Sequence, residues 1–285
     1  MKFADLHLHT DGSDGSDNLE TRIRDAKSKG LSCIAITDHD TVHKGLEKPI
    51  TYRNGLEIIS GMELELKVNG YGLDFLAYFV TKNDPGISEF VEGFRRKRVE
   101  RMKEMVDNLN EVIEQHIEYE EVFEKASNVV VRPHLAQVLV ERGIADSMDH
   151  AYDEFLSSDK GVYVPLERPD VKDFFSLVHN AGGVVSLAHP GRDIIREDFE
   201  EVVETLVKKG LDGIEGEYFY VGFDEHPERF NFGNSFAKKI AKKHGLFITG
   251  GSDCHGINSN HYTLGEHKIS YEYVDKMKEV WKKGV

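Results

Sequence analysis

The 285-residue chain has only two cysteines, Cys33 and Cys254, so a disulfide framework is not indicated. It also lacks a run of about 18 consecutive apolar residues, the length that a membrane helix needs. The first residues do not show the basic and then apolar pattern of a signal peptide, because Asp5, His7 and His9 interrupt it at once. These absences lead us to expect a cytoplasmic protein.

Positive charge is also scarce, since 36 lysines and arginines face 51 aspartates and glutamates and the net charge is -15. This balance argues against a protein that coats long nucleic acid by releasing counterions. It leaves short phosphorylated substrates open, because bound divalent cations would add positive charge that the count omits.

Two histidines separated by one residue stand near the start of the chain, in the stretch 5–10. Side chains of a strand alternate between faces, so His7 and His9 should point the same way while Leu6 and Leu8 enter the packed layer behind. Two imidazoles directed at one point suggest a metal ion. A chance His-x-His on an exposed strand face is the alternative for this short motif alone.

Predicted strands and helices alternate over most of the chain, which is typical of an α/β protein with a parallel sheet. We expect a helix over 18–29, a strand over 31–37, a helical stretch to about residue 54 and a strand over 56–60. A hairpin is expected around Asn69 and Gly70. The alternation returns with strands predicted at 183–188, 212–216 and 246–250. Between them, 85–165 reads as a helical insertion, which leaves 1–84 and 166–285 for the main domain.

Candidate metal ligands fall at the ends of separate predicted strands or just beyond them, where parallel α/β folds collect their functional groups. They are His7, His9, His39, Glu63, His189, Asp253 and His255, with Asp14 in the first such loop. Mixed imidazole and carboxylate ligands suit Zn²⁺, Mn²⁺ or Fe²⁺ better than Ca²⁺ or Mg²⁺. One ion cannot use so many ligands, so we expect a cluster of two to three divalent metal ions.

Such a cluster points to phosphate chemistry. Metal ions about 3.5 to 4 Å apart can bridge a hydroxide and clamp a phosphoryl oxygen during an in-line displacement. The residues themselves therefore favour a metal-dependent phosphoester hydrolase.

Six stretches that carry these ligands, 5–10, 13–15, 36–40, 61–63, 187–190 and 250–256, resemble the successive motifs of the PHP (polymerase and histidinol phosphatase) superfamily. The resemblance spans nearly the whole chain in the same order. It implies a distorted (β/α)7 barrel that holds up to three ions, usually manganese, zinc or iron.

Within the superfamily the chain is similar to the branch that includes nucleoside 3′,5′-bisphosphate phosphatase and the 5′ to 3′ exoribonuclease RNase AM. That resemblance implies that Arg98, Arg101 and His134 of the insertion contact substrate phosphates. Residues three apart share a helix face, and arginine forks match phosphate oxygens. The alternative is a solvated helix face on which these arginines pair with Glu92, Glu100 and Glu104.

The resemblance also implies how the ligands are shared among the ions. His7, His9, Glu63 and Asp253 would surround one ion, Asp14, His39 and His255 a second, and Glu63, Asp74 and His189 a third. Asp74 departs from the branch, which commonly has a histidine there, so the third site is expected to be weaker or to prefer another metal. A metal-bridging hydroxide held by Glu63 would attack phosphorus.

The implied substrate is a small nucleotide with phosphates at both ends of the ribose, such as adenosine 3′,5′-bisphosphate, or the 5′ end of a short RNA. One alternative is another small phosphomonoester, such as histidinol phosphate. A second is a non-catalytic, metal-stabilised interaction module. No membrane partner is expected.

Overall fold

The computed structural model describes residues 1–126, 129–218, 220, 231–256 and 264–284. The chain divides into two compact units, Met1–Glu89 with Arg168–Val285, and Phe90–Glu167. No helix in the described part of the chain is both long and apolar enough to cross a membrane.

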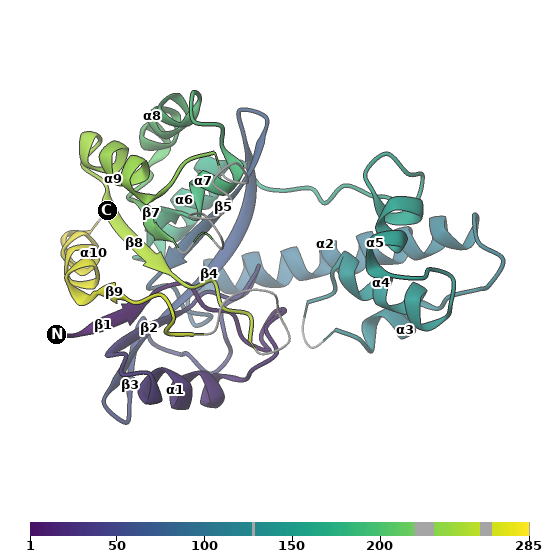
Figure 1. Ribbon diagram of the computed structural model, residues 1–285, viewed down its shortest axis with the longest axis horizontal. Coiled ribbons are helices and arrows are strands. Elements are labelled where there is room, and N and C mark those ends of the chain that lie inside the picture. The colour runs from purple at the N-terminus through teal and green to yellow at the C-terminus, as the bar shows by residue number, and fades with distance from the viewer. Residues whose placement is uncertain (127–128, 219, 221–230, 257–263, 285) are drawn as a thin grey trace. The chain divides into compact units, whose positions relative to one another are not determined.

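The larger unit is a nearly closed barrel of strands with helices outside it, as the sequence predicts (Figure 1). The ring follows the order β1 (Phe3–Asp5), β2 (Cys33–Ile36), β4 (Leu56–Val68), β5 (Tyr71–Tyr78), β6 (Val184–Leu187), β7 (Gly213–Tyr218) and β8 (Phe247–Gly251). Neighbours in the ring pair in parallel except at β5, which is antiparallel to both β4 and β6. This reversed strand distorts the barrel.

The ring closes where the chain beyond β1 runs beside β8. The Leu6 amide donates a hydrogen bond to the Gly250 carbonyl at 3.0 Å, and the Asp253 amide donates to the His7 carbonyl at 2.9 Å. A parallel bridge joins Leu8 to Cys254. The first and last predicted ligand motifs are therefore neighbours across one seam.

The helical stretch predicted between residues 41 and 54 is wrong. Residues 41–49 form turns and bends, and Ile50–Arg53 is a strand, β3, that pairs antiparallel with β4. Asn54 and Gly55 have φ values of 51° and 80°, which suit the type I′ turn of a two-residue hairpin. Pairing with a buried central strand therefore decides the conformation of this segment.

The hairpin predicted at Asn69 and Gly70 is confirmed, with φ values of 49° and 88°. Its first arm is longer than expected, because β4 continues through Gly61 without a break. A Cβ on Gly61 would lie 2.5 Å from the Ala77 carbonyl oxygen of β5. Glycine at this position lets the two strands pair closely along their full length.

Helices cover the outside of the barrel, among them α1, α8, α9 and α10 (Figure 1). The helices of this unit are α1 (Leu19–Ser28), α6 (Val171–Asn180), α7 (Pro190–Asp193), α8 (Phe199–Lys209), α9 (Asn234–Lys243) and α10 (Tyr271–Lys283). Asn18 caps α1 by accepting from the Thr21 amide, as the sequence predicts. A short strand, β9 (Ile269–Ser270), pairs antiparallel with β1.

The smaller unit is helical and has its own hydrophobic core. It contains most of α2 (Pro85–Asn110), together with α3 (Tyr119–Phe123), α4 (Arg132–Glu141), α5 (Met148–Ala151) and a π-helical turn over Tyr152–Leu156. Buried side chains from α2 and α4, including Met105, Leu109, Leu135 and Leu139, form its centre. α2 begins within the residues of the barrel unit and continues into this one.

Candidate metal centre

The candidate ligands come from the carboxyl ends of the barrel strands and the loops that follow. His7 and His9 follow β1, and their side chains are completely buried, as are those of Leu6 and Leu8, which alternate with them. His39 follows β2 and forms a bridge with Glu63 of β4. Period-two alternation thus directs both early imidazoles to one side while the leucines enter the core.

The first group of potential ligand atoms contains His7, His9, Glu63 and Asp253. The Nε2 atom of His7 lies 3.3 Å from both Glu63 Oε1 and Asp253 Oδ1. His9 Nε2 lies 3.2 Å from Glu63 Oε2 and 3.1 Å from Asp253 Oδ1. Two imidazoles and two carboxylates therefore face one point in the buried interior.

The second group contains His9, Asp14, His39 and His255. Asp14 lies 3.7 Å from both His9 Nδ1 and His39 Nε2, and 3.5 Å from His255 Nε2. The rings of His9 and His255 stack with centroids 4.0 Å apart. His9 thus has one ring nitrogen near each group, a sharing that the sequence-based grouping did not include.

The third group contains Glu63, Asp74 and His189. His189 Nε2 lies 3.3 Å from Glu63 Oε1 and 3.8 Å from Asp74 Oδ2. The same Asp74 oxygen lies 3.3 Å from the Arg192 guanidinium, which is a competing cation for this carboxylate. All nine predicted ligands therefore fall in three overlapping groups, and Glu63 belongs to two of them.

Buried polar atoms in these groups fit metal ions better than hydrogen bonds. Within the described residues, His7 Nε2, both ring nitrogens of His9 and Glu63 Oε2 are buried and form no hydrogen bond of acceptable geometry, although carboxylate oxygens lie close. Buried polar groups are normally satisfied. Lone pairs that converge without hydrogen bonds are the arrangement that a divalent cation requires, and the donor set suits manganese, zinc or iron.

The pKa values of the grouped side chains also favour a bound cation. Burial lowers the pKa of His9, but Asp253 and Glu63 outweigh it and raise that pKa to about 10. Burial raises the pKa of Glu63, but the surrounding histidines hold it well below its usual range. Without metal, the His9 imidazole holds its proton beside an ionised Glu63 carboxylate, and a bound divalent ion would replace that proton.

Asp74 differs from the other carboxylates. Burial and the neighbouring negative charge of Glu63 raise its pKa to about 6, despite the opposing effects of His189 and Arg192. This carboxylate is therefore the least readily ionised member of the third group.

Glu215, which sequence reasoning missed, supports the groups from behind. Its side chain on β7 is completely buried, with Oε1 3.2 Å from His7 Nδ1, while Oε2 accepts a hydrogen bond from the His189 amide at 2.8 Å. A carboxylate on the remote nitrogen orients an imidazole and fixes which nitrogen faces the metal. Its sequence signal was weak, because the predicted strand 212–216 contains a second acidic residue, Asp212, and nothing in the sequence separates the two.

Asp38 and Asp5, also missed, anchor the loops that carry ligands. Asp38 accepts hydrogen bonds from the Thr10 amide at 2.6 Å and the Ser13 hydroxyl at 3.0 Å, which holds the loop before Asp14. Asp5 accepts from the Ser252 amide and hydroxyl at 3.0 and 2.6 Å, next to Asp253. These buried contacts pre-organise both ends of the seam.

Two ligands occupy backbone conformations that non-glycine residues rarely adopt. His189 has φ of 22° and Asp253 has φ of 53°. Such conformations cost on the order of 1–3 kcal/mol each and persist where surrounding structure fixes them. Each residue stands two positions after the end of its strand, and the turn there directs its side chain towards Glu63 or His7.

Arg22 of α1 joins the two ligand loops at the seam. Its guanidinium donates to the His9 carbonyl at 2.9 Å, to the Cys254 carbonyl at 3.0 Å and to Cys254 Sγ at 3.1 Å. Cys254 is buried and packs in the core beside Leu8. The structure thus places this thiol behind the ligand loops.

The remaining predicted site residues belong to the helical unit. Arg98 is buried, with its guanidinium 5.7 Å from the Phe94 ring, and Arg101 is half-buried and donates to the Val164 carbonyl. The His134 Nδ1 atom accepts from the Val131 amide at 3.2 Å. A solvated face does not describe Arg98 and Arg101.

Comparison with known proteins finds a matching family model and several related chains. The family model described as PHP domain matches residues 5–169. The chain is 26% identical over 258 residues to a 5′-3′ exoribonuclease Rnm of Salmonella typhimurium, covering 88% of this chain and 84% of that one. It is 26% identical over 258 residues to a 3′,5′-nucleoside bisphosphate phosphatase of Chromobacterium violaceum, covering 90% and 88%.

A third relative carries a different activity in its name. It is a phosphoribosyl 1,2-cyclic phosphate 1,2-diphosphodiesterase of Eggerthella lenta, 27% identical over 258 residues and covering 88% of this chain and 94% of that one. Among solved structures, a Bifidobacterium adolescentis protein classed as a metal-dependent phosphoesterase matches with a TM-score of 0.74 and 28% identity, covering 99% and 96% of the two chains.

Proposed function

Because the chain belongs to the PHP family of metal-dependent phosphoesterases, we propose that it hydrolyses a phosphomonoester of a nucleoside 3′,5′-bisphosphate. The observation that carries the proposal is the convergence of nine imidazole and carboxylate ligands in three overlapping groups around Glu63. A purely structural metal site needs about four ligands and leaves no open position. This site offers more ligands than structural support requires.

We propose that the three groups hold two to three ions of manganese, zinc or iron. Such ions, when bound, offset the negative charge of phosphoryl oxygens and make water a stronger nucleophile near neutral pH. Glu63 lies within 3.3 Å of His7, His9, His39 and His189. Its two oxygens therefore lie among four candidate imidazole ligands and link the groups to one another.

Selection of a nucleotide with two phosphates is assigned to the helical unit. Arg98, Arg101 and His134 carry donors suited to phosphate oxygens, and a guanidinium fork matches them in a bidentate manner. The second phosphate of a bisphosphate needs such a recognition site beyond the metals. The Chromobacterium violaceum relative, named for nucleoside bisphosphates, supports this choice.

A second candidate function is removal of nucleotides from the 5′ end of short RNA. The name of the Salmonella typhimurium relative, a 5′-3′ exoribonuclease, favours it. The two activities use the same chemistry at phosphorus and differ in what lies beyond the scissile phosphate. A cytoplasmic location stays a prediction.

The test is phosphate release from adenosine 3′,5′-bisphosphate by the manganese-loaded protein. AMP, histidinol phosphate and a ribose 1,2-cyclic phosphate are assayed in parallel. His39→Ala removes a proposed ligand, and His43→Ala is the matched control, since its buried imidazole accepts from the Gly45 amide and belongs to none of the three groups. We expect selective turnover of the bisphosphate, lost in His39→Ala and kept in His43→Ala.

Equal turnover of all substrates would contradict the assignment of a second phosphate site. Selective turnover of the cyclic phosphate would replace the proposed substrate. Activity that survives in His39→Ala would refute the role of the second group of ligands.

A further inference from the structure

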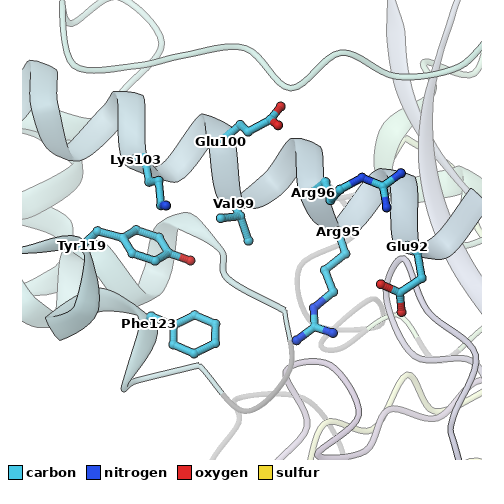
Figure 2. A pocket seen from close by; sticks show the side chains of 8 residues that line it. All are labelled: Glu92, Arg95, Arg96, Val99, Glu100, Lys103, Tyr119 and Phe123. Atoms are coloured by element: carbon cyan, nitrogen blue, oxygen red, sulfur yellow. The ribbon is translucent and has the colours of Figure 1, made fainter.

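A pocket in the helical unit lies apart from every residue assigned above. Its volume is about 540 Å³, and it is lined by Glu92, Arg95, Arg96, Val99, Glu100 and Lys103 of α2 with Tyr119 and Phe123 of α3 (Figure 2). Arg95, Val99 and Lys103 are four residues apart and share one face of α2. Arg98 and Arg101 do not line it.

The positive charges of this pocket are available to a ligand. Within the part of the chain that the structure describes, Arg95, Arg96 and Lys103 are exposed and none of them forms an ion pair with a carboxylate within 4 Å. Figure 2 shows Arg95 and Lys103 extending to the side of α2 where the aromatic rings lie, while Glu100 points away. This is unusual in a unit that is otherwise rich in acidic side chains.

The other wall of the pocket is aromatic. The Tyr119 and Phe123 rings stack with centroids 5.9 Å apart, and the Lys103 ammonium lies 5.1 Å from the centre of the Tyr119 ring. Phe123 is 42% exposed, a large apolar surface left open to solvent. Tyr119 is partly buried against the core of the helical unit. Aromatic rings beside cations that form no ion pair are the features with which proteins stack a base and hold its phosphate.

We infer that this pocket binds one nucleotide unit of single-stranded RNA, with the base against Tyr119 and Phe123 and the adjoining phosphates at Arg95 and Lys103. The choice of RNA rests on the second candidate function proposed above, while the base-and-phosphate chemistry rests on the pocket alone. A single strand is favoured because a base inside a duplex has no free face to stack on the rings.

The test is fluorescence anisotropy of the full-length, manganese-loaded protein. The probe is a ten-nucleotide, 5′-phosphorylated RNA with phosphorothioate linkages, which slow hydrolysis, used as a single strand and as a duplex. We expect the R95Q/K103Q variant to raise Kd about tenfold. It should also reduce the slope of log Kd against log salt by about 1.4, or about 0.7 for each lost phosphate contact.

Tyr119→Ala should weaken single-strand binding by about five- to a hundredfold and remove the preference over duplex. Tyr119→Phe keeps the ring and should bind normally, which separates stacking from misfolding. The matched charge control is Lys97→Gln, because Lys97 pairs with Glu167 at 2.8 Å and lies outside the pocket. It should change Kd less than threefold.

Equal losses in R95Q/K103Q and Lys97→Gln would overturn the inference, as would normal binding by Tyr119→Ala. Hydrolysis of adenosine 3′,5′-bisphosphate is measured on the same variants and should be unchanged, since none of them alters a proposed metal ligand. Wild-type protein that binds RNA through the pocket but hydrolyses no bisphosphate would refute the proposed function and leave this inference standing.

Discussion

Replacing Glu215 by glutamine tests whether the carboxylate behind the ligands sets their metal affinity. Glutamine has nearly the same shape, but it offers one acceptor oxygen where Glu215 serves both His7 Nδ1 and the His189 amide. Whichever way the amide turns, its NH₂ group faces a donor on one side. One of the two ligands therefore loses its support and meets an unfavourable contact.

The magnitude follows from these contacts. Loss of a partner behind a metal-bound histidine typically costs 10- to 100-fold in metal affinity, which is about 1.4 to 2.7 kcal/mol. Because Glu215 is completely buried and touches two ligands, we expect the upper half of that range, about 30- to 100-fold. Activity should return when manganese is raised in proportion.

The assay is phosphate release as a function of free manganese, with bound metal measured by elemental analysis after dialysis. Glu217→Gln is the matched control, because Glu217 lies on the same strand and contacts Lys238 and Tyr273 on the barrel exterior. Circular dichroism and thermal melting establish that both variants fold. An unchanged metal titration for Glu215→Gln would refute the reasoning that the carboxylate tunes these ligands.

Three further predictions concern the barrel unit. Arg192→Gln should release Asp74 from its ion pair and lower the Kd of the third ion about tenfold. When metal is scarce, the variant should then bind one more equivalent of metal than the unchanged protein, and an unchanged stoichiometry would contradict this. Since the metal-free pKa of His9 is about 10, metal binding at pH 8 should release protons and strengthen as pH rises, which calorimetry in buffers of different ionisation enthalpy measures. Arg22→Ala should lower the free energy of unfolding, measured in urea, by at least about 3 kcal/mol. Arg24 is exposed on the same helix, so Arg24→Ala should lower the same free energy by under about 0.5 kcal/mol.

Much of the barrel was predictable because its signals are local. Buried parallel strands appear as short apolar runs, and the groups that follow them converge at one end of the barrel whatever the details of packing. Local signals mispredicted residues 41–54 as helical. Asn54 and Gly55 form a hairpin turn instead, and pairing with β4 decides the conformation of the segment. Pairing between strands is a tertiary effect that helical patterning does not report.

The site also combines residues that local sequence signals predict with residues that they do not. Ligands such as His7 and His189 could be proposed from residue type and position, whereas Glu215 could not, because its role depends on facing a particular imidazole across the barrel. The second nitrogen of His9 and the competition of Arg192 for Asp74 likewise appear only when distances are known. The pocket on α2 was hidden because Tyr119 follows that helix after an intervening loop.

The seam between β1 and β8 has a consequence for synthesis on the ribosome. It joins His7 to Asp253, so about 246 residues must be made after His7 before Asp253, the last member of the first group, exists. At roughly 5 to 20 residues per second this delay is on the order of 12 to 50 s. During that time the segment after β1 is an open strand edge, prone to pairing with other chains. The nascent chain therefore cannot complete the first group of candidate ligands until residue 253 has been made.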